Sequence, residues 1–221
     1  MSKKRNLTQE KIILASLEVL EKHGIQNLSM RKVADAMNVQ APALYWHFKN
    51  KQDLLQGLSS YISAQIALPD AELSWQDKAR WLAMQSHQAM RAVPDGAEIM
   101  MKTIPIDKSR LNIIDCLFCA FFDAGFDEEQ TLALCNLIDN YVTGIAIDET
   151  SQDRTLAEVG PDKIHGLFTS MFERKDMQHL RVIPAMKRHA EAHERFDLNF
   201  SFGLDVIIAG AEKILETTKG S

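Results

Sequence analysis

The sequence predicts an all-α protein with a small N-terminal unit followed by a larger one. Apolar residues recur at spacings of three and four along most of the chain, and no alternating β-branched run is long enough to indicate a sheet. Residues that cap helices, Thr8, Ser29 and Asn50, stand just before helical runs. We expect three parts: a head (1–49), a connecting helix (50–68) and a body (69–221).

The composition indicates a globular chain. Of the 221 residues, 46% are hydrophobic, which is enough for a substantial core. No uninterrupted apolar stretch approaches the ~20 residues that span a bilayer, and the basic N-terminus is followed by an amphipathic segment rather than by the apolar core of a signal peptide. An odd number of cysteines, Cys116, Cys119 and Cys135, indicates reduced thiols in a cytoplasmic protein.

Charge is distributed unevenly along the chain. Residues 1–52 hold nine basic and four acidic side chains, whereas the rest of the chain holds 16 basic and 26 acidic ones. A basic head on an acidic body favours a polyanion as the partner of the head alone. Chance segregation of surface charge would give the same pattern, so charge does not decide the function.

The first two helices of the head are bounded by clear signals. Thr8 caps the first helix, and Gly24 lies just beyond its end. Ser29 caps the second helix, after which Asn38 tolerates the left-handed conformation that a tight stop requires. The residues expected to face inward are Ile12, Ile13, Ala15, Val19 and Leu20 in the first helix and Val33, Ala34 and Met37 in the second.

A third helix begins two residues after that stop. Gln40 can occupy its cap, and Pro42 fits its first turn because the missing N–H would go unused there. The helix is expected to continue through 43–48 and to end at Lys49. Asn50 then caps the connecting helix.

Two short helices joined by a tight turn form the helix-turn-helix arrangement. The second of them carries three consecutive bulky side chains, Tyr45, Trp46 and His47. Because a helix turns by about 100° per residue, these cannot all face a core, and Leu44 and Phe48 already supply an inward face. We expect the outward aromatic side chains to pack on sugar–phosphate. The alternative is a small hydrophobic helix buried beneath the first one.

The head resembles the DNA-binding domain of the Tet repressor family. The matching residues are the run 44–55 and, upstream of it, Gly24, Ser29, Arg31, Val33 and Ala34. The resemblance implies that Arg31 contacts a base, since an arginine suits the O6 and N7 atoms of guanine. The other positions of the implied DNA interface are Ser29, Gln40, Ala41, Pro42, Ala43, Tyr45, Trp46, His47 and Lys51.

Two of these positions depart from the classical tetracycline repressors of that family. Ala41 replaces a glutamine, and Ala43 replaces a threonine. A glutamine can read adenine with two hydrogen bonds, whereas an alanine offers only a methyl group to thymine. The resemblance therefore implies a similar double-stranded DNA operator with a different base preference at these positions.

The body is expected to be helical throughout. We place helices at about 74–93, 97–103, 108–124, 127–150, 162–174 and 196–217. A polar stretch with Gly160 and Pro161 precedes the fifth of them, and a linker rich in histidine and charge runs to about Arg195. The last helix is apolar on more than one face, so its own core or a partner must cover it.

The body resembles the sensor domain of the tetracycline repressors themselves. The matching segments are 74–77, 95–97, 125–126 and 202–213. The resemblance implies a homodimer in which the helices at 127–150 and 196–217 pair with their symmetry mates. Two-fold symmetry would place two heads on successive major-groove faces, about 34–36 Å apart. It also implies that a ligand in the body moves the connecting helix and releases the DNA.

The residues expected in the pocket differ from those that hold drug and magnesium in the tetracycline repressors. Leu82 stands in place of an asparagine, Ser86 of a phenylalanine, Met100 of a metal-ligating histidine and Ile104 of an arginine. A thioether is a poor ligand for Mg²⁺, a hard cation that prefers oxygen. We therefore expect no metal, no cofactor and a hydrophobic effector other than magnesium–tetracycline.

The expected ligand-binding residues combine an apolar wall with polar anchors. The wall comprises Leu82, Met100, Met101, Ile104, Pro105, Leu117, Phe168 and Met171. The anchors are Ser86, His87, Thr103, Asn140 and, across the dimer, Asp148. Each apolar residue taken singly also fits an ordinary core position.

Two weak motifs raise an enzyme as an alternative. Cys116 and Cys119 form a CxxC, but no second pair or nearby histidine completes a zinc site. His189 and His193 share a helical face but lack the glutamate that the zincin motif requires. We interpret them as core thiols and a solvated linker, and expect no enzyme. A DNA-binding protein without an effector is the second alternative, and it would show little sequence preference.

Overall fold

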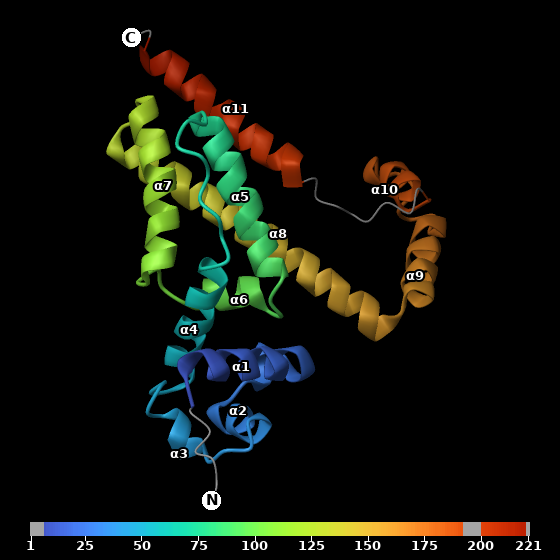
Figure 1. The fold of residues 1–221 in the computed structure, drawn as a ribbon. Helices are drawn as coiled ribbons and strands as arrows, with labels where there is room; N and C mark the ends of the chain where they lie inside the picture. The colour runs from blue at the N-terminus through green and yellow to red at the C-terminus, as the bar shows by residue number, and fades with distance from the viewer. Residues whose placement is uncertain (1–6, 192–199, 220–221) are drawn as a thin grey trace, which may run out of the picture.

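The computed structural model describes residues 7–191 and 200–219, and within them the chain has eleven α-helices, one 3-10 turn and no strand (Figure 1). The elements are α1 (Gln9–His23), η1 (Ile25–Asn27), α2 (Met30–Ala36), α3 (Ala41–Leu44), α4 (Lys51–Ser63), α5 (Trp75–Arg91), α6 (Gly96–Met101), α7 (Lys108–Ala124), α8 (Glu128–Val159), α9 (Pro161–Glu173), α10 (Val182–Glu191) and α11 (Phe200–Lys219). The all-α prediction is confirmed. In this part of the chain no helix has the length and apolar character needed to cross a membrane.

The head lies at one end of the molecule, where α1, α2 and α3 pack beside the start of α4 (Figure 1). Its predicted caps are confirmed: Thr8 Oγ1 accepts a hydrogen bond from the Lys11 amide at 3.3 Å, and Ser29 Oγ accepts one from the Lys32 amide at 3.2 Å. Asn38 has the left-handed conformation, with φ of 53°. Short polar caps therefore fix where the head helices begin and end.

The third helix is shorter than the sequence indicates. α3 ends at Leu44, and the next three residues form a turn in which the amides of His47 and Phe48 both donate to the carbonyl of Leu44 at 2.9 Å. Leu44 and Phe48 are buried as expected, whereas Tyr45 and Trp46 point outward. The tighter turn brings Phe48 into the core without burying its aromatic neighbours.

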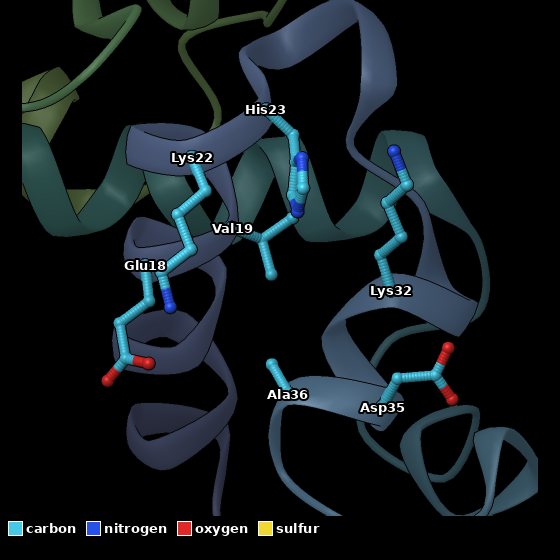
Figure 2. Close-up of a pocket in the computed structure, with 7 residues that line it drawn as sticks. All are labelled: Glu18, Val19, Lys22, His23, Lys32, Asp35 and Ala36. Atoms are coloured by element: carbon cyan, nitrogen blue, oxygen red, sulfur yellow. The ribbon is translucent and has the colours of Figure 1, made fainter.

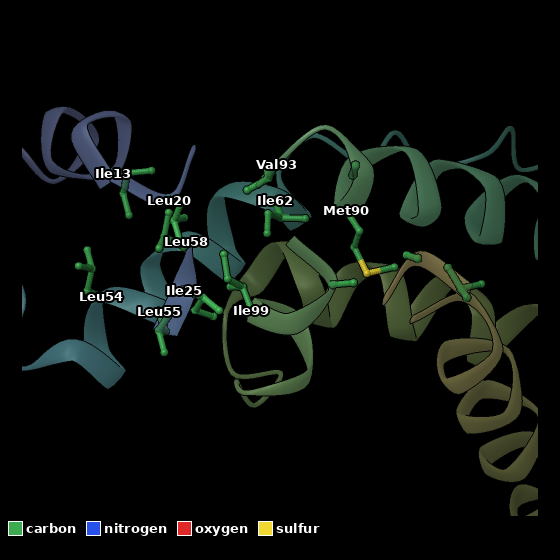
Figure 3. Close-up of a cluster of buried hydrophobic side chains, with 14 of the residues drawn as sticks. Ile13, Leu20, Ile25, Leu54, Leu55, Leu58, Ile62, Met90, Val93 and Ile99 are labelled. Atoms are coloured by element: carbon green, nitrogen blue, oxygen red, sulfur yellow. The ribbon is translucent and has the colours of Figure 1, made fainter. Parts of the chain in front are cut away.

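α4 contributes to two parts of the core. Its residues Leu54, Leu55, Leu58 and Ile62 are buried, between α1 residues at one end and α5 and α6 residues at the other (Figure 3). α4 approaches the head closely at Gly57, where a Cβ would lie 2.6 Å from the Phe48 ring. The helix ends at Ser63, rather more than one turn before the end of the connecting helix expected at residue 68.

The body is built around α8, the longest helix of the described residues (Figure 1). It packs against α5, α6, α7 and α11. The sequence predicted that α8 ends near Thr150, and this was wrong, because the helix continues to Val159. Ion pairs with α5 hold this part of α8. The Arg91 guanidinium bonds to the Asp153 carboxylate of the extension at 2.6 Å and to the Glu149 carboxylate just before it at 3.2 Å.

α9 and α10 form an arm that projects from the body beyond the end of α8 (Figure 1). No residue of α9 is buried in this single chain. α10 occupies part of the stretch that the sequence analysis assigned to a linker, because Ile183 and Met186 give this charged segment one apolar side. His193 and the expected start of the last helix at Phe196 lie outside the described residues.

Candidate functional site

The far side of the head presents an arginine and two aromatic side chains to solvent. The Arg31 side chain on α2 is 88% exposed, and its nearest carboxylate, Asp35, lies 4.0 Å away. Trp46 is 89% exposed and Tyr45 is 50% exposed. An unburied cluster of this kind has no role in the core of the head, and it matches the chemistry of a DNA-docking surface.

The other expected DNA contacts lie on the same two helices or close to them. Gln40 and Pro42 are exposed at the start of α3, whereas Ala41 and Ala43 are half-buried. Gln40 occupies the N-cap of α3, as expected, although its side chain makes no capping hydrogen bond. His47 is half-buried, and its carbonyl accepts a hydrogen bond from Gln9 Nε2 at 3.2 Å.

Lys51 has a structural partner that the sequence did not indicate. Its Nζ donates to the carbonyl oxygen of Ile25 at 2.9 Å and so ties the start of α4 to η1. Ser29, similarly, accepts from the Lys32 amide, which leaves its hydroxyl hydrogen free to point elsewhere.

A groove of about 320 Å³ separates α1 from α2 (Figure 2). Its lining residues are Glu18, Val19, Lys22, His23, Lys32, Asp35 and Ala36. Charged side chains of both signs line it, so the groove favours neither an anion nor a cation. It belongs to the head and contains none of the residues expected to bind an effector.

Asp95 joins the head to the body. The residue is 3% exposed, and its Oδ2 accepts a hydrogen bond from the Ile25 amide of the head at 2.7 Å. Its Oδ1 accepts from Arg154 Nη2, which comes from the extension of α8. Gln26 of the head bonds in addition to Glu98 of α6 at 2.9 Å. The junction is therefore buried, charged and fully paired at Asp95.

The segment that follows α6 is hydrogen-bonded to α4. Gln52 Nε2 donates to the carbonyl of Lys102 at 2.8 Å. Gln56 Nε2 donates to the carbonyl of Ile104 at 2.7 Å, and its Oε1 accepts from the Ile104 amide at 3.3 Å. A displacement of the end of α6 would therefore act directly on α4, which carries part of the head's core.

Some of the expected pocket residues meet at the inner side of α6. Leu82 and Leu117 belong to the buried core, and Met100 packs against it. Thr103 is buried, and its Oγ1 donates to the carbonyl of Ile99 at 2.9 Å. An apolar wall with one hydroxyl is therefore present here, although Met101, Ile104 and Pro105 are exposed.

Arg110, for which the sequence pattern indicated no role, lies at the centre of this region. Its Nη1 donates to Thr103 Oγ1 at 3.1 Å, and its Nη2 donates to the Met100 carbonyl at 3.3 Å. Longer contacts of 3.4 Å reach the Thr103 carbonyl and Ser59 Oγ of α4. A cation at the last carbonyls of α6 is well placed, because a helix C-terminus carries partial negative charge. Burial lowers the pKa of Arg110, and the carboxylates of Asp139 and Asp107 oppose that shift.

Asp139 of α8 was also missed. The residue is accessible to solvent, yet burial by the surrounding protein raises the pKa of its carboxyl, and Arg110 opposes the rise. One turn earlier, burial raises the pKa of Cys135 to about 11, so its thiol stays neutral.

Several expected anchors lie away from this region. His87 Nε2 lies 2.8 Å from Glu149 Oε2, and its ring stacks on Phe200, with 4.7 Å between centroids. Asn140 and Asp148 are exposed on α8, and Ser86 is half-buried on α5. The remaining wall candidates, Phe168 and Met171, lie on α9 in the arm.

The CxxC motif is not buried as expected. Cys116 is half-buried and packs against the core, whereas Cys119 is exposed. Within the described ranges, no group of three histidine, cysteine or acidic side chains is arranged to hold a metal ion.

Comparison with known proteins identifies both halves of the chain. Residues 12–58 match the model of the bacterial regulatory proteins of the tetR family, and residues 68–215 match the tetracycline repressor-like C-terminal domain. The class C tetracycline repressor protein of Escherichia coli is 30% identical over 215 residues, which cover 96% of this chain and 94% of the repressor. The chain belongs to the TetR family.

Solved structures of TetR proteins have the same fold. A variant of TetR from Acinetobacter baumannii AYE, in complex with minocycline, is 28% identical, with a TM-score of 0.71 and coverage of 94% of both chains. BioQ with its double-stranded DNA operator is 24% identical, with a TM-score of 0.67 and coverage of 93% of this chain and 98% of BioQ. These likenesses confirm an all-α helix-turn-helix head joined to a helical ligand-binding body.

Family membership sets the general function. The protein is a ligand-responsive transcriptional regulator, and its relatives are regulators rather than enzymes. The match of the C-terminal domain to tetracycline repressors places its body in the same class as theirs. The identities of its operator and effector depend on the residues described above.

Proposed function

We propose that this TetR-family protein is a repressor that binds a palindromic operator as a homodimer and leaves it when a largely apolar molecule enters the body. The observation that carries this proposal is the position of Met100. It packs against the core on α6, three residues before Thr103, and the segment that follows is bonded to α4 through Gln52 and Gln56. A ligand beside Met100 would therefore bear on the helix that supports the head.

Magnesium–tetracycline does not fit these residues. Met100 offers a thioether sulfur, which is a poor ligand for a hard cation. The hydroxyl oxygen of Thr103, three residues after Met100, is already bonded to the Ile99 carbonyl and to Arg110. The A. baumannii TetR variant was crystallised with minocycline, but the donor set here favours a ligand without a metal.

Exposed apolar residues on neighbouring helices support the homodimer. Leu137 of α8 and Val206 of α11 are about half exposed in the single chain, and α8 packs against α11. An apolar face of this kind on a regulator is usually covered by a second copy. The expected parts (1–49, 50–68 and 69–221) would then serve as DNA reader, connector and sensor.

In the head, Arg31 would contact a guanine, and Ser29, Tyr45, Trp46, His47 and Lys51 would dock on the backbone. Ala41 and Ala43 lack polar groups, which supports a base preference unlike that of the classical tetracycline repressors. Arg31→Ala should weaken operator binding by about 1–3 kcal/mol, whereas a phosphate contact should mainly change the salt dependence.

The proposal is tested by selecting DNA from a random pool with the purified protein and then measuring release by a panel of hydrophobic compounds. We expect one enriched palindrome and release by part of the panel. An induction of ~100-fold requires ~3 kcal/mol of preference for the non-binding conformation. Enrichment of no sequence would indicate an effector-independent DNA-binding protein instead. Release by submicromolar magnesium–tetracycline would show that the assignment of the effector is wrong.

A further inference from the structure

One turn of α4 contacts the head and the body at the same time. On the body side it meets the segment after α6, where Gln52 Nε2 donates to the Lys102 carbonyl at 2.8 Å. Gln56 Nε2 donates to the Ile104 carbonyl at 2.7 Å, and Gln56 Oε1 accepts from the Ile104 amide at 3.3 Å. One side-chain amide therefore engages both backbone groups of one residue. We call Gln52 and Gln56, together with residues 102–104, the α4–α6 clamp.

Gly57, the residue after Gln56, lies against the head. A Cβ at this position would be 2.6 Å from the Phe48 ring. Glycine inside a helix costs about 1 kcal/mol relative to alanine, and the close approach of Phe48 is the physical reason for it here. Phe48 is buried, and its amide donates to the carbonyl of Leu44, the last residue of α3. The turn that Phe48 closes carries the exposed side chains of Tyr45 and Trp46.

A continuous chain of contacts therefore runs from the segment after α6 to α3. It passes through Ile104, Gln56, Gly57, Phe48 and Leu44, and three of these five residues lie outside α4. Its first link is a pair of hydrogen bonds, and its second is a contact with no space for one more carbon atom. A close-packed contact passes a displacement on, because protein interiors have low compressibility.

The body end of this chain is itself held in place. Arg110 Nη2 of α7 donates to the Met100 carbonyl at 3.3 Å, and its Nη1 donates to Thr103 Oγ1 at 3.1 Å. The end of α6 is thus fixed to α7, and the α4–α6 clamp fixes α4 to the residues that follow. Without the Gln56 amide, the clamp would keep only the single bond from Gln52.

We infer that Gln56 is a positioning residue, which transmits the position of the segment after α6 to α3 and so holds the DNA-docking side chains in the arrangement that fits the operator. This inference rests on the proposed function, because it assigns the coupling of body and head to one side chain. Gln56 is not among the residues expected to contact DNA. An effect of Gln56 on operator binding would therefore act through Gly57 and Phe48.

The first experiment measures amide hydrogen exchange without DNA in wild type, Gln56→Leu and Gln65→Leu. Leucine neither donates nor accepts, and Gln65 is the matched control because its Nε2 donates to the nearby Tyr61 carbonyl of α4 at 3.3 Å. The readouts are the amides of His47 and Phe48, which both donate to the Leu44 carbonyl at 2.9 Å. We expect their exchange to be about five- to ten-fold faster in Gln56→Leu and unchanged in Gln65→Leu, with exchange in the middle of α8 unchanged in both.

The second experiment measures the affinity of each protein for two duplexes of equal length at one salt concentration. One duplex is the operator selected by wild type, and the other has a random sequence. We expect Gln56→Leu to bind the operator about ten-fold more weakly, a difference of ~1.4 kcal/mol. Its affinity for the random duplex should be unchanged, because the basic surface of the head is intact.

Unchanged exchange at His47 and Phe48, an unchanged operator affinity, or an equal loss of affinity for both duplexes would each overturn the inference. A lower melting temperature of Gln56→Leu without the other two changes would show that Gln56 only stabilises the fold. Failure of the proposed function would appear differently, as the absence of an enriched palindrome with wild type. The exchange experiment needs no DNA, so it would still decide whether Gln56 couples the end of α6 to α3.

Discussion

Two aspartates in this molecule have opposite surroundings. Asp95, at the junction of head and body, is buried, and its two oxygens are bonded to Ile25 and Arg154. Asp139, in the wall of the body, is accessible and has no bonded partner among the described residues. A satisfied buried carboxylate holds two elements in one arrangement, whereas an unsatisfied one leaves interaction energy to a molecule that arrives later.

This difference indicates that the head–body junction and the wall of the body have different roles. Under the proposed function, the junction would transmit a movement, which requires fixed contacts between α6, the end of α8 and the head. The body has to receive a ligand, which requires polar groups that the protein does not satisfy itself. Substitutions at the junction should therefore destabilise the fold, and substitutions at the body wall should change binding with little loss of stability.

The largest loss in the free energy of unfolding is expected for a substitution in the turn between α5 and α6. A Cβ at Gly96 would overlap the backbone carbonyl of Met90, which cannot move aside as a flexible side chain would. Gly96→Ala should lower the free energy of unfolding by about 3 kcal/mol or more. Urea unfolding followed by circular dichroism measures this. Gly166→Ala in α9 is the matched control, because no atom lies within 4 Å of its Cβ position, and it should be neutral or stabilising by up to about 1 kcal/mol.

The next largest effect is expected at Asp95. Asp95→Ala leaves the Ile25 amide buried without an acceptor and should cost about 2–3 kcal/mol of unfolding free energy. Arg154→Ala should cost less, about 1–2 kcal/mol, because the Arg154 side chain is half exposed, although the Asp95 carboxylate that it leaves is buried. Equal losses in the two variants would show that the ion pair, rather than the hydrogen bond to the head, holds the junction.

A smaller loss in the free energy of unfolding is expected for substitutions at Arg110. Arg110→Met removes the cation from the end of α6 and leaves the Met100 and Thr103 carbonyls without a donor, at a cost of about 1–2 kcal/mol. Arg110→Lys should recover part of this, since it keeps the charge but not the forked geometry. Amide hydrogen exchange along α6 should become faster in the Met variant. Unchanged exchange there would contradict the bracing role of Arg110.

The smallest change in the free energy of unfolding is expected at Asp139, where a substitution should stabilise the protein rather than destabilise it. Because burial raises the pKa of this carboxyl in the folded state, its charge disfavours folding above that pKa and has no such effect below the pKa of the unfolded chain. Asp139→Asn should therefore stabilise the protein at about pH 7, by less than ~1 kcal/mol because the residue is accessible. The gain should shrink as the pH falls to about 4. Asp123→Asn, at an exposed site on α7, provides the comparison.

Local signals were enough to predict the head and much of the body. Thr8, Ser29 and Asn50 accept the expected capping hydrogen bonds, and α7 spans the expected residues. Caps and apolar periodicity act within a few residues, so a sequence shows them directly. The shorter α3 depends instead on how Phe48 packs against Gly57 of α4, a contact between two helices.

The polar part of the body could not be predicted in the same way. Arg110 interacts with residues of α4 and α6, and Asp139 is coupled to it from α8, so their proximity arises only from the packing of four helices. A charged residue on a helix usually indicates a solvated face, and nothing in the sequence marked these two as exceptions. The contact of His87 with Glu149 of α8 also depends on how two helices pack, so the sequence alone does not indicate it.

The core shared along α4 has a consequence for how such proteins can be recombined. Leu54, Leu55 and Leu58 complete the packing of α1, so a chain cut after Lys49 would lack part of the interior of its own head. The DNA-binding head of this protein can be fused to a different sensor domain only if α4 is included in the fusion. The graft would then have to reproduce, on the new sensor, the surface that Gln52 and Gln56 recognise. Exchange of modules among these regulators is thus constrained at this helix more than at any loop.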